Sequence, residues 1–408
     1  MTSLSSTTHA PAAAPSGTSA SETVPVKVVD SDIHVNPRSA VELADSLPSE
    51  WAHFKDLLYG GGILGASVIF APPNEGRRLD AFGSDGGPAG SDPGLTGRQL
   101  FDEAGVDLAV IIPLTDKSAA NPEHEAAMSA ANNTWLASSW LGEYNGHERY
   151  KGTIRVSSDP DLAVREIEKW AGHPHFVQVM LNPYLGIPLG HRTFWPVYEA
   201  ASRAGLVVCT HVTLQRPGPA LLTSSGAPRT FLENHAQFSM LYAAHLVSLL
   251  EEGVFGRFPD LRFTFVEGGY AWCLPLLWRL DKHWQSLRSE VPALERKPSD
   301  YVREHVSFTR QPYEEPRDMK YMARVIEWLG PTTLEFATDY PHWDGDYSTA
   351  MGFQGVSREV RAQILGLNAI EKLRLSSTRS SRHWSEFPGA TGPGGLDAPT
   401  QFQPPVPQ

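Results

Sequence analysis

Short apolar runs rich in β-branched residues alternate along the chain with longer amphipathic stretches. Such runs are typical of strands buried on both faces, and stretches of this kind are typical of helices. Eight runs predict strands, and a helical stretch follows each of them. The predicted strands cover residues 26–34, 106–114, 151–156, 176–182, 206–211, 261–267, 306–311 and 334–339.

This alternation predicts a (β/α)8 barrel of the α/β class, also called a TIM barrel. The alternative is an open, doubly wound sheet with insertions. A Gly- and Pro-rich insertion follows the first strand, within residues 37–100. Helix boundaries are marked by Asn121 as a cap before Pro122 and by Gly105 as a stop. No linker divides the alternation, so we predict one barrel domain over residues 25–375.

Both ends of the chain are poor in residues that build a core. Residues 1–24 are mostly Ser, Thr, Ala and Pro, and residues 376–408 are rich in Pro and Gly, which predicts disordered tails. The first stretch lacks the apolar segment of a secretory signal. No apolar run approaches the roughly 20 residues needed to span a bilayer. We therefore expect a cytoplasmic protein without a membrane partner.

The charge and cysteine content narrow the set of partners. The formal net charge is −12, from 34 basic and 46 acidic residues, and no basic run occurs, which argues against nucleic acid. The two cysteines are too few for a disulfide scaffold and fit a reducing compartment. We expect a small-molecule substrate and a homo-oligomer, a dimer.

Polar residues at the ends of the predicted strands form a candidate site. In a (β/α)8 barrel the active site lies at the carboxyl ends of the strands. Asp32 and His34 end the first predicted strand, His211 the fifth, Glu267 the sixth and Asp339 the eighth. One such residue alone is usually a helix cap or a satisfied core group. Together they supply the three or four converging N and O donors that a divalent metal needs.

The first strand carries two of these donors. Side chains two positions apart on a strand project to the same side, so Asp32 and His34 face one way. If Val28 and Asp30 point into the barrel with them, both donors reach its mouth. Two donors on one strand strengthen the prediction of a metal site.

Several segments resemble the amidohydrolase-2 family, which includes aminocarboxymuconate semialdehyde decarboxylase. They are DSDIHVNP on the first strand, FPDLRFTFVEGG around the sixth, FATDYPHWD after the eighth and ILGLNAIEKL near the end. The likeness covers residues 26–375. It implies a metal-dependent barrel enzyme in which Asp32, His34 and His211 bind the metal. Asp339 matches the carboxylate of the eighth strand, which binds the metal and can accept a proton from metal-bound water.

The chain departs from the family pattern at two of these positions. Many members carry His-x-His on the first strand, whereas Asp32 holds the first position here. Decarboxylating members usually place a catalytic histidine on the sixth strand, where this chain has Glu267. The second departure favours hydrolysis over decarboxylation.

Three carboxylates in one site bear on the number of metal ions. Asp32, Glu267 and Asp339 around a single dication would leave a net charge of about −1, so one carboxyl would stay protonated. A two-metal centre with Glu267 as a ligand relieves this repulsion. The alternative is that Glu267 is a general acid or base beside one metal. The donor types suit zinc first, with iron or manganese as alternatives.

The chemistry expected first is hydrolysis by metal-activated water. Asp339 or Glu267 would take the proton and pass it to the leaving group. Amide, ester, thioester and activated C–C bonds of a small organic acid derivative all fit. The alternative is non-oxidative decarboxylation of an aromatic or unsaturated carboxylic acid. A second alternative is a catalytically decayed barrel that only binds or acts as a scaffold.

Weaker hypotheses concern residues around the metal ligands. His342 and Trp343 follow Asp339 closely and can line the substrate pocket, or form a structural loop. Arg155 ends the third strand and can meet a substrate carboxylate, or pair with a nearby acid. His245 lies within a helix and Cys209 lies one layer below the mouth, so we interpret both as structural.

Overall fold

The computed structural model describes residues 27–54, 73–114, 121–212, 228, 230–347 and 352–375. The predicted tails, residues 1–24 and 376–408, lie outside this part of the chain. No helix within it is long and apolar enough to cross a membrane.

Eight strands form one parallel sheet whose spatial order follows the sequence. They are β1 (Val29–Ile33), β2 (Leu108–Ile111), β3 (Tyr150–Arg155), β4 (Phe176–Leu181), β5 (Val207–His211), β6 (Phe263–Val266), β7 (Val306–Thr309) and β8 (Leu334–Glu335). Ile33 bridges Tyr340, and the Asp339 amide donates to the Asp32 carbonyl at 3.0 Å. These contacts bring β1 against the segment after β8 and close the sheet into a barrel, as the sequence predicted.

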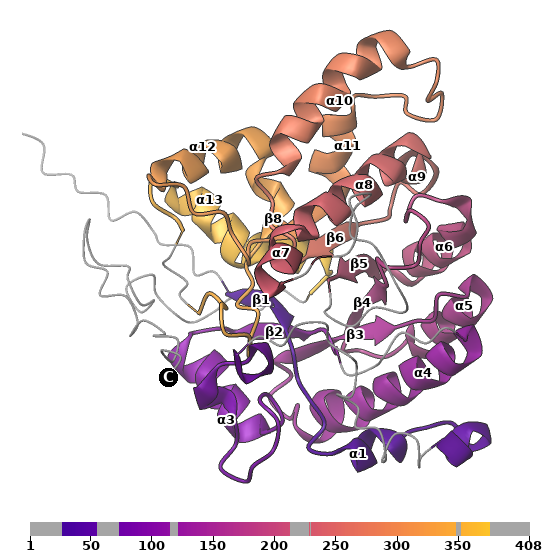
Figure 1. Cartoon of the computed structure of the whole chain (residues 1–408), viewed down its shortest axis with the longest axis vertical. Coiled ribbons are helices and arrows are strands. Elements are labelled where there is room, and N and C mark those ends of the chain that lie inside the picture. Colours follow the sequence, from indigo (N-terminus) through magenta and orange to yellow (C-terminus); the bar gives the residue numbers. More distant parts are fainter. Residues whose placement is uncertain are drawn as a thin grey trace, which may run out of the picture.

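Helices surround the barrel, as Figure 1 shows. They are α1 (Ala40–Ala44), α3 (Pro93–Gly97), α4 (Pro122–Ser138), α5 (Pro160–Trp170), α6 (Trp195–Ala204), α7 (Phe231–Ala236), α8 (Phe238–Glu251), α9 (Val254–Arg257), α10 (Cys273–Leu287), α11 (Pro298–His305), α12 (Lys320–Leu329), α13 (Arg358–Ala362) and α14 (Asn368–Lys372). The Asn121 side chain caps α4 by accepting from two backbone amides, as predicted. Helix α11 lies between the helix expected after the sixth strand and the seventh strand, and it was not predicted.

The core consists of an outer layer between sheet and helices and a filled barrel interior. At the amino ends of the strands, Val29, Leu108, Val177 and Val207 pack inside the barrel against Leu373, which follows α14. A second inner cluster lies nearer the carboxyl ends and consists of Ile112, Met180, Cys209 and Val266. Because apolar side chains plug the amino end, the polar carboxyl end is the mouth that can admit a ligand.

A bulge in β1 corrects one assumption made from the sequence. Val28 packs in the outer core and Val29 in the inner cluster, so the expected inward position of Val28 is wrong. The pairing of β1 with β2 slips between Asp30 and Ile33. Such an extra residue shifts the side-chain alternation by one position. The slip explains how Asp32 faces the mouth although Val29 also points inward.

Candidate metal centre

The five predicted metal-site residues lie together at the carboxyl end of the barrel. Asp32 and His34 come from β1 and the residue after it, His211 ends β5, and Glu267 follows β6 directly. Asp339 lies in the segment after β8 that bonds to β1. All five are buried, with at most 7% of each residue exposed.

Short distances connect these side chains. The Nε2 atom of His34 lies 3.1 Å from Asp339 Oδ1 and 3.4 Å from Asp32 Oδ1. The Nε2 atom of His211 lies 3.6 Å from Asp32 Oδ2 and 3.2 Å from Glu267 Oε2. The centroids of the two imidazole rings lie 4.8 Å apart, and the rings pack edge to face. The cluster is therefore compact enough for its donors to share one or two small ions.

Backbone carbonyls hold both imidazoles in an orientation that suits metal binding. His34 Nδ1 bonds to the Ile112 carbonyl at 2.7 Å, and His211 Nδ1 bonds to the Val212 carbonyl. A carbonyl only accepts, so the Nδ1 atoms carry the hydrogens. The Nε2 lone pairs then face the cluster, which is the arrangement that metal-binding histidines use.

Several buried atoms of the cluster that could bind a metal have no hydrogen-bond partner in the part of the chain that the structure describes. They are both oxygens of Asp32, Nε2 of His211 and Oδ2 of Asp339. Leaving buried polar atoms unpaired is costly, and more so when they are charged. Ligand atoms of Asp32, His34 and His211 lie within 4.8 Å of one another, as do those of His34, Glu267, Asp339 and His342. A divalent cation would satisfy these atoms, and the residues present fit one.

Burial controls the electrostatics of the site. It raises the pKa of Glu267 well above the usual value, and the charge of Asp32 adds to this. Burial also raises the pKa of Asp339, with the charge of Glu267 next in importance. Burial lowers the pKa of His34 to about 3, so its imidazole is neutral. Without a cation, burial therefore favours the protonated carboxyls of Glu267 and Asp339 and the neutral imidazole of His34.

The backbone bends sharply where Glu267 and Asp339 leave their strands. Their φ angles are 58° and 59°, in the left-handed region that non-glycine residues rarely occupy. Such conformations cost on the order of 1 kcal/mol or more and cluster at functional sites. The Glu267 amide donates to Thr309 Oγ1 at 2.9 Å, which holds this turn against the end of β7.

The three residues predicted to contact substrate lie in three different environments. His342 belongs to the metal-site cluster, because its Nδ1 contacts Asp339 Oδ1 and its ring lies 4.6 Å from that of His34. Trp343 is 36% exposed beside this cluster. Arg155 is buried and donates to the Pro113 carbonyl at 2.9 Å, so its guanidinium has a structural partner. Their contacts with substrate stay predictions.

Three further residues at the mouth were missed by the sequence analysis. His235 on α7 lies near Glu267 and pairs with Asp344, which ends the TDYPHWD segment. Arg77, from the insertion after β1, forms an antiparallel bridge with His342. Asp344 could have been found because it belongs to the quoted motif, whereas nothing in the local sequence marks Arg77 or His235.

Two residues interpreted as structural have structural environments. His245 on α8 is buried, accepts from the Leu189 amide at 3.1 Å and donates to the Pro183 carbonyl at 2.9 Å. Cys209 is fully buried inside the barrel, and burial raises its thiol pKa well above the usual value. Both side chains therefore lie in the packed interior, which fits a structural role.

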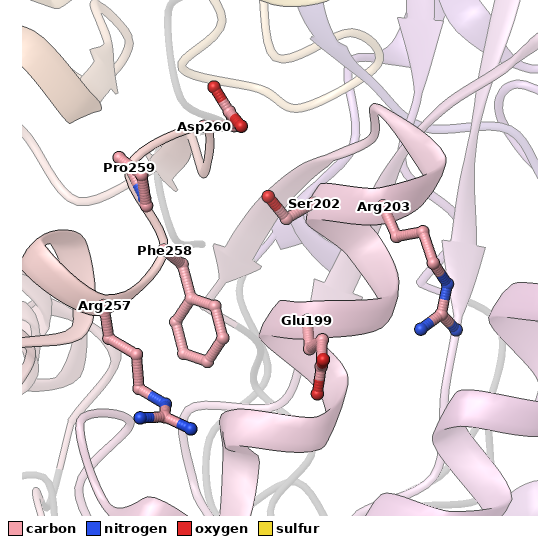
Figure 2. Close-up of a pocket in the computed structure, with 7 residues that line it drawn as sticks. All are labelled: Glu199, Ser202, Arg203, Arg257, Phe258, Pro259 and Asp260. Carbon is pink, nitrogen blue, oxygen red and sulfur yellow. The ribbon is translucent and has the colours of Figure 1, made fainter.

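A cavity of about 510 Å³ lies away from this cluster. Figure 2 shows it on the outside of the barrel, between α6 and the turn after α9. Arg203, Arg257 and Phe258 are among its lining residues, and the predicted site residues are not. The metal-site cluster is therefore the stronger candidate for the chemistry.

Comparison with known proteins identifies the family. The amidohydrolase family model matches residues 29–375, so the chain belongs to the amidohydrolase family. No curated protein matched the sequence.

Solved structures share the fold. An amidohydrolase from Mycobacterium avium subsp. paratuberculosis is 20% identical, with a TM-score of 0.61 over 85% of this chain and 98% of the other. A 5-carboxyvanillate decarboxylase from Novosphingobium aromaticivorans, complexed with manganese, is 18% identical, with a TM-score of 0.62 over 86% and 96%. A 2,6-dihydroxybenzoate decarboxylase from Rhizobium is 17% identical, with a TM-score of 0.59 over 86% and 99%.

Proposed function

We propose that the protein is a metal-dependent, non-oxidative decarboxylase of an aromatic or unsaturated carboxylic acid. The observation that carries the proposal is the set of buried, unpaired donor atoms of Asp32, His211 and Asp339 that converge beside His34. Several similar structures are decarboxylases of aromatic acids, three of them solved with manganese, which favours this chemistry over the hydrolysis expected first.

Asp32, His34, His211 and Asp339 would hold the metal ion. When bound, a divalent cation supplies positive charge that attracts the substrate carboxylate and stabilises the negative charge that develops as the C–C bond breaks. The donor set suits zinc, iron or manganese.

Decarboxylation needs a proton at the carbon that loses carbon dioxide. Glu267 occupies the sixth-strand position at which decarboxylating relatives usually carry a histidine. Its Oε2 faces His211, while its Oε1 faces the mouth at 4.0 Å from His235. Because burial raises its pKa, Glu267 holds a proton more readily than an exposed glutamate, and it would deliver this proton to the substrate carbon.

Arg77 is placed to attract an anionic substrate. Residues directly opposite in an antiparallel bridge project to the same face, so Arg77 shares a face with His342, whose ring lies in the metal-site cluster. Its charge also acts to lower the pKa of Glu267 and of Asp339, which places it near both carboxyls. A guanidinium at the mouth suits a carboxylate ligand.

Hydrolysis is the second candidate, favoured by the glutamate at the sixth-strand position. The two overlapping donor groups, which share His34, also suit two ions as the sequence hypothesis required. In that case Glu267 would be a ligand of the second ion. Metal counting on the purified protein separates the cases, because a one-to-one stoichiometry with full activity contradicts the two-metal centre.

The experiment is an assay of carbon dioxide release by the metal-loaded protein. The probes are 2,6-dihydroxybenzoate and 5-carboxyvanillate, and their methyl esters and amides test hydrolysis in parallel. We expect chelator-sensitive carbon dioxide release from an acid, lost in Asp339→Asn and strongly reduced in Glu267→Gln. Hydrolysis of the esters or amides without carbon dioxide release would contradict the decarboxylase and support the hydrolase.

A further inference from the structure

Helix α7 brings a histidine to the mouth of the barrel that the metal site does not use. The Thr230 side chain caps this helix by accepting from the Glu233 amide at 3.1 Å. The His235 ring lies 5.6 Å from the Phe231 ring and 5.0 Å from the Phe238 ring. Its side chain is 22% exposed, so it lies on the solvent side of the buried cluster.

One nitrogen of His235 faces two carboxylates. Its Nε2 lies 3.3 Å from Asp344 Oδ2 and 4.0 Å from Glu267 Oε1. The first distance suits a hydrogen bond, whereas the second is too long for one. A carboxylate partner indicates that Nε2 carries the hydrogen. His235 therefore presents a donor at the mouth, next to the carboxyl that we assign to proton delivery.

The partner of this histidine is itself held in place. The backbone carbonyl of Asp344 accepts from the Gln311 side chain, which follows β7. Two residues later, Asp346 pairs with the buried Arg310. These contacts tie the loop after β8 to the end of β7, so Asp344 can hold the imidazole in one orientation.

Aromatic side chains complete this side of the mouth. The centroid of the Phe231 ring lies 6.5 Å from that of the Trp343 ring. Phe231 packs beside His235, and Trp343 directly precedes Asp344 in the loop after β8. Flat aromatic groups with a placed donor are typical of sites that bind a planar, oxygen-bearing ligand.

We propose that His235 determines substrate specificity by sharing its Nε2 hydrogen, in a three-centre hydrogen bond, between Asp344 Oδ2 at 3.3 Å and an oxygen substituent of the substrate, so that Asp344 positions the imidazole for this contact. The inference rests on the proposed function, since it assumes that a planar acid binds with its carboxylate at the metal centre. The contact is non-covalent and sets which acids fit the mouth, in addition to the residues that bind the metal.

The test compares His235→Phe, His235→Gln and wild type, each loaded with manganese. Phenylalanine keeps a ring between Phe231 and Phe238 without a donor, and glutamine supplies an amide donor without an imidazole. The assay measures KM and kcat for whichever of the two probe acids, 2,6-dihydroxybenzoate or 5-carboxyvanillate, wild type decarboxylates. It also compares binding of 2,6-dihydroxybenzoate with binding of benzoate, which lacks the oxygen substituents. His283→Ala, an exposed histidine on α10, is the control.

We expect His235→Phe to raise KM about tenfold with a smaller change in kcat, since one hydrogen bond is worth about that factor. Its preference for 2,6-dihydroxybenzoate over benzoate should fall by the same factor, while the metal content stays unchanged. His235→Gln should restore most of the wild-type KM and of the preference for 2,6-dihydroxybenzoate. Asp344→Asn should shift the KM and this preference in the same direction as His235→Phe. His283→Ala should match wild type.

The outcomes separate this inference from the proposed function. If wild type releases no carbon dioxide from any probe, the proposed function fails and the inference fails with it. If wild type is active and the phenylalanine variant keeps its KM and its preference, only the role of His235 is overturned. A folded glutamine variant as poor as the phenylalanine variant also overturns the donor role. If the phenylalanine variant does not fold, His235→Ala takes its place under the same criteria.

Discussion

Gly268 lies against the side chain that ties together two of the metal-site strands. A methyl group added at this position would lie 2.1 Å from Cδ2 and 2.3 Å from Cε2 of Tyr242. Tyr242 is fully buried, and its hydroxyl lies 2.6 Å from the Val266 carbonyl and 3.1 Å from the Thr210 carbonyl. Those two carbonyls immediately precede Glu267 and His211, so the tyrosine fixes the spacing of these residues.

The cost of Gly268→Ala follows from these contacts. The tyrosine ring must move from 2.1 Å to an ordinary contact of about 3.4 Å, and its buried position gives it no free space. Overpacking of a core costs about 1–3 kcal/mol. Loss of the hydroxyl bond leaves a buried carbonyl without a donor, which costs about 1–3 kcal/mol more. We expect a loss of roughly 4 kcal/mol in the free energy of unfolding, together with weaker metal binding.

Urea denaturation of the manganese-loaded protein, followed by circular dichroism, measures this loss. Tyr242→Phe removes the hydroxyl but keeps the ring, so it should cost only the hydrogen-bond part, about 1–3 kcal/mol. Gly146→Ala is the matched control, because a methyl group there meets no atom within 4 Å. If Gly268→Ala unfolds at the same urea concentration as Gly146→Ala and binds manganese equally well, the packing argument is refuted.

Three further predictions concern pH, a buried ion pair and the thiols. Burial raises the pKa values of Glu267 and Asp339, so these two carboxyls bind more protons in the folded metal-free protein than in the unfolded chain above about pH 4. The stability that they contribute should therefore fall as the pH rises above about 4, and manganese should remove this fall; a stability difference between wild type and Glu267→Gln that stays constant with pH without metal would contradict it. Arg310→Met leaves the buried Asp346 carboxylate without its main partner and should cost about 3–5 kcal/mol by urea denaturation, and a cost below about 1 kcal/mol would be inconsistent with a buried pair. Both cysteines are buried and burial raises their thiol pKa values, so neither should react with a thiol reagent until the protein unfolds; rapid labelling of the native protein would show that one is accessible.

Much of the fold and the site could be predicted because their signals are local. Each strand is marked by its own apolar run, and each predicted metal ligand stands at the end of such a run. The rule that barrel sites lie at the carboxyl ends then brings Asp32, His211 and Asp339 together, although they are distant in the sequence. The structure places Asp32 and His211 in one group of metal-ligand atoms and Asp339 in a second, and His34 belongs to both groups.

The remaining features depend on contacts that leave no local pattern. The slip in β1 puts Val28 on the outer face of the sheet instead of the inner face, and the order of apolar and polar residues around it does not reveal the slip. His235 and Arg77 reach the mouth from a helix and an insertion, and composition does not say where such segments fold. A sharp turn at Asp339 brings His342 into the metal-site cluster, and the sequence after the last strand does not reveal this turn.

Anomalous diffraction from crystals grown with manganese tests the central claim most directly. We expect one strong peak bounded by Asp32, His34, His211 and Asp339, and its loss in crystals of Asp339→Asn. A second peak beside Glu267 would add the second metal. Crystals without a peak between these four residues, from protein that stays active in the presence of a chelator, would contradict a metal-dependent enzyme.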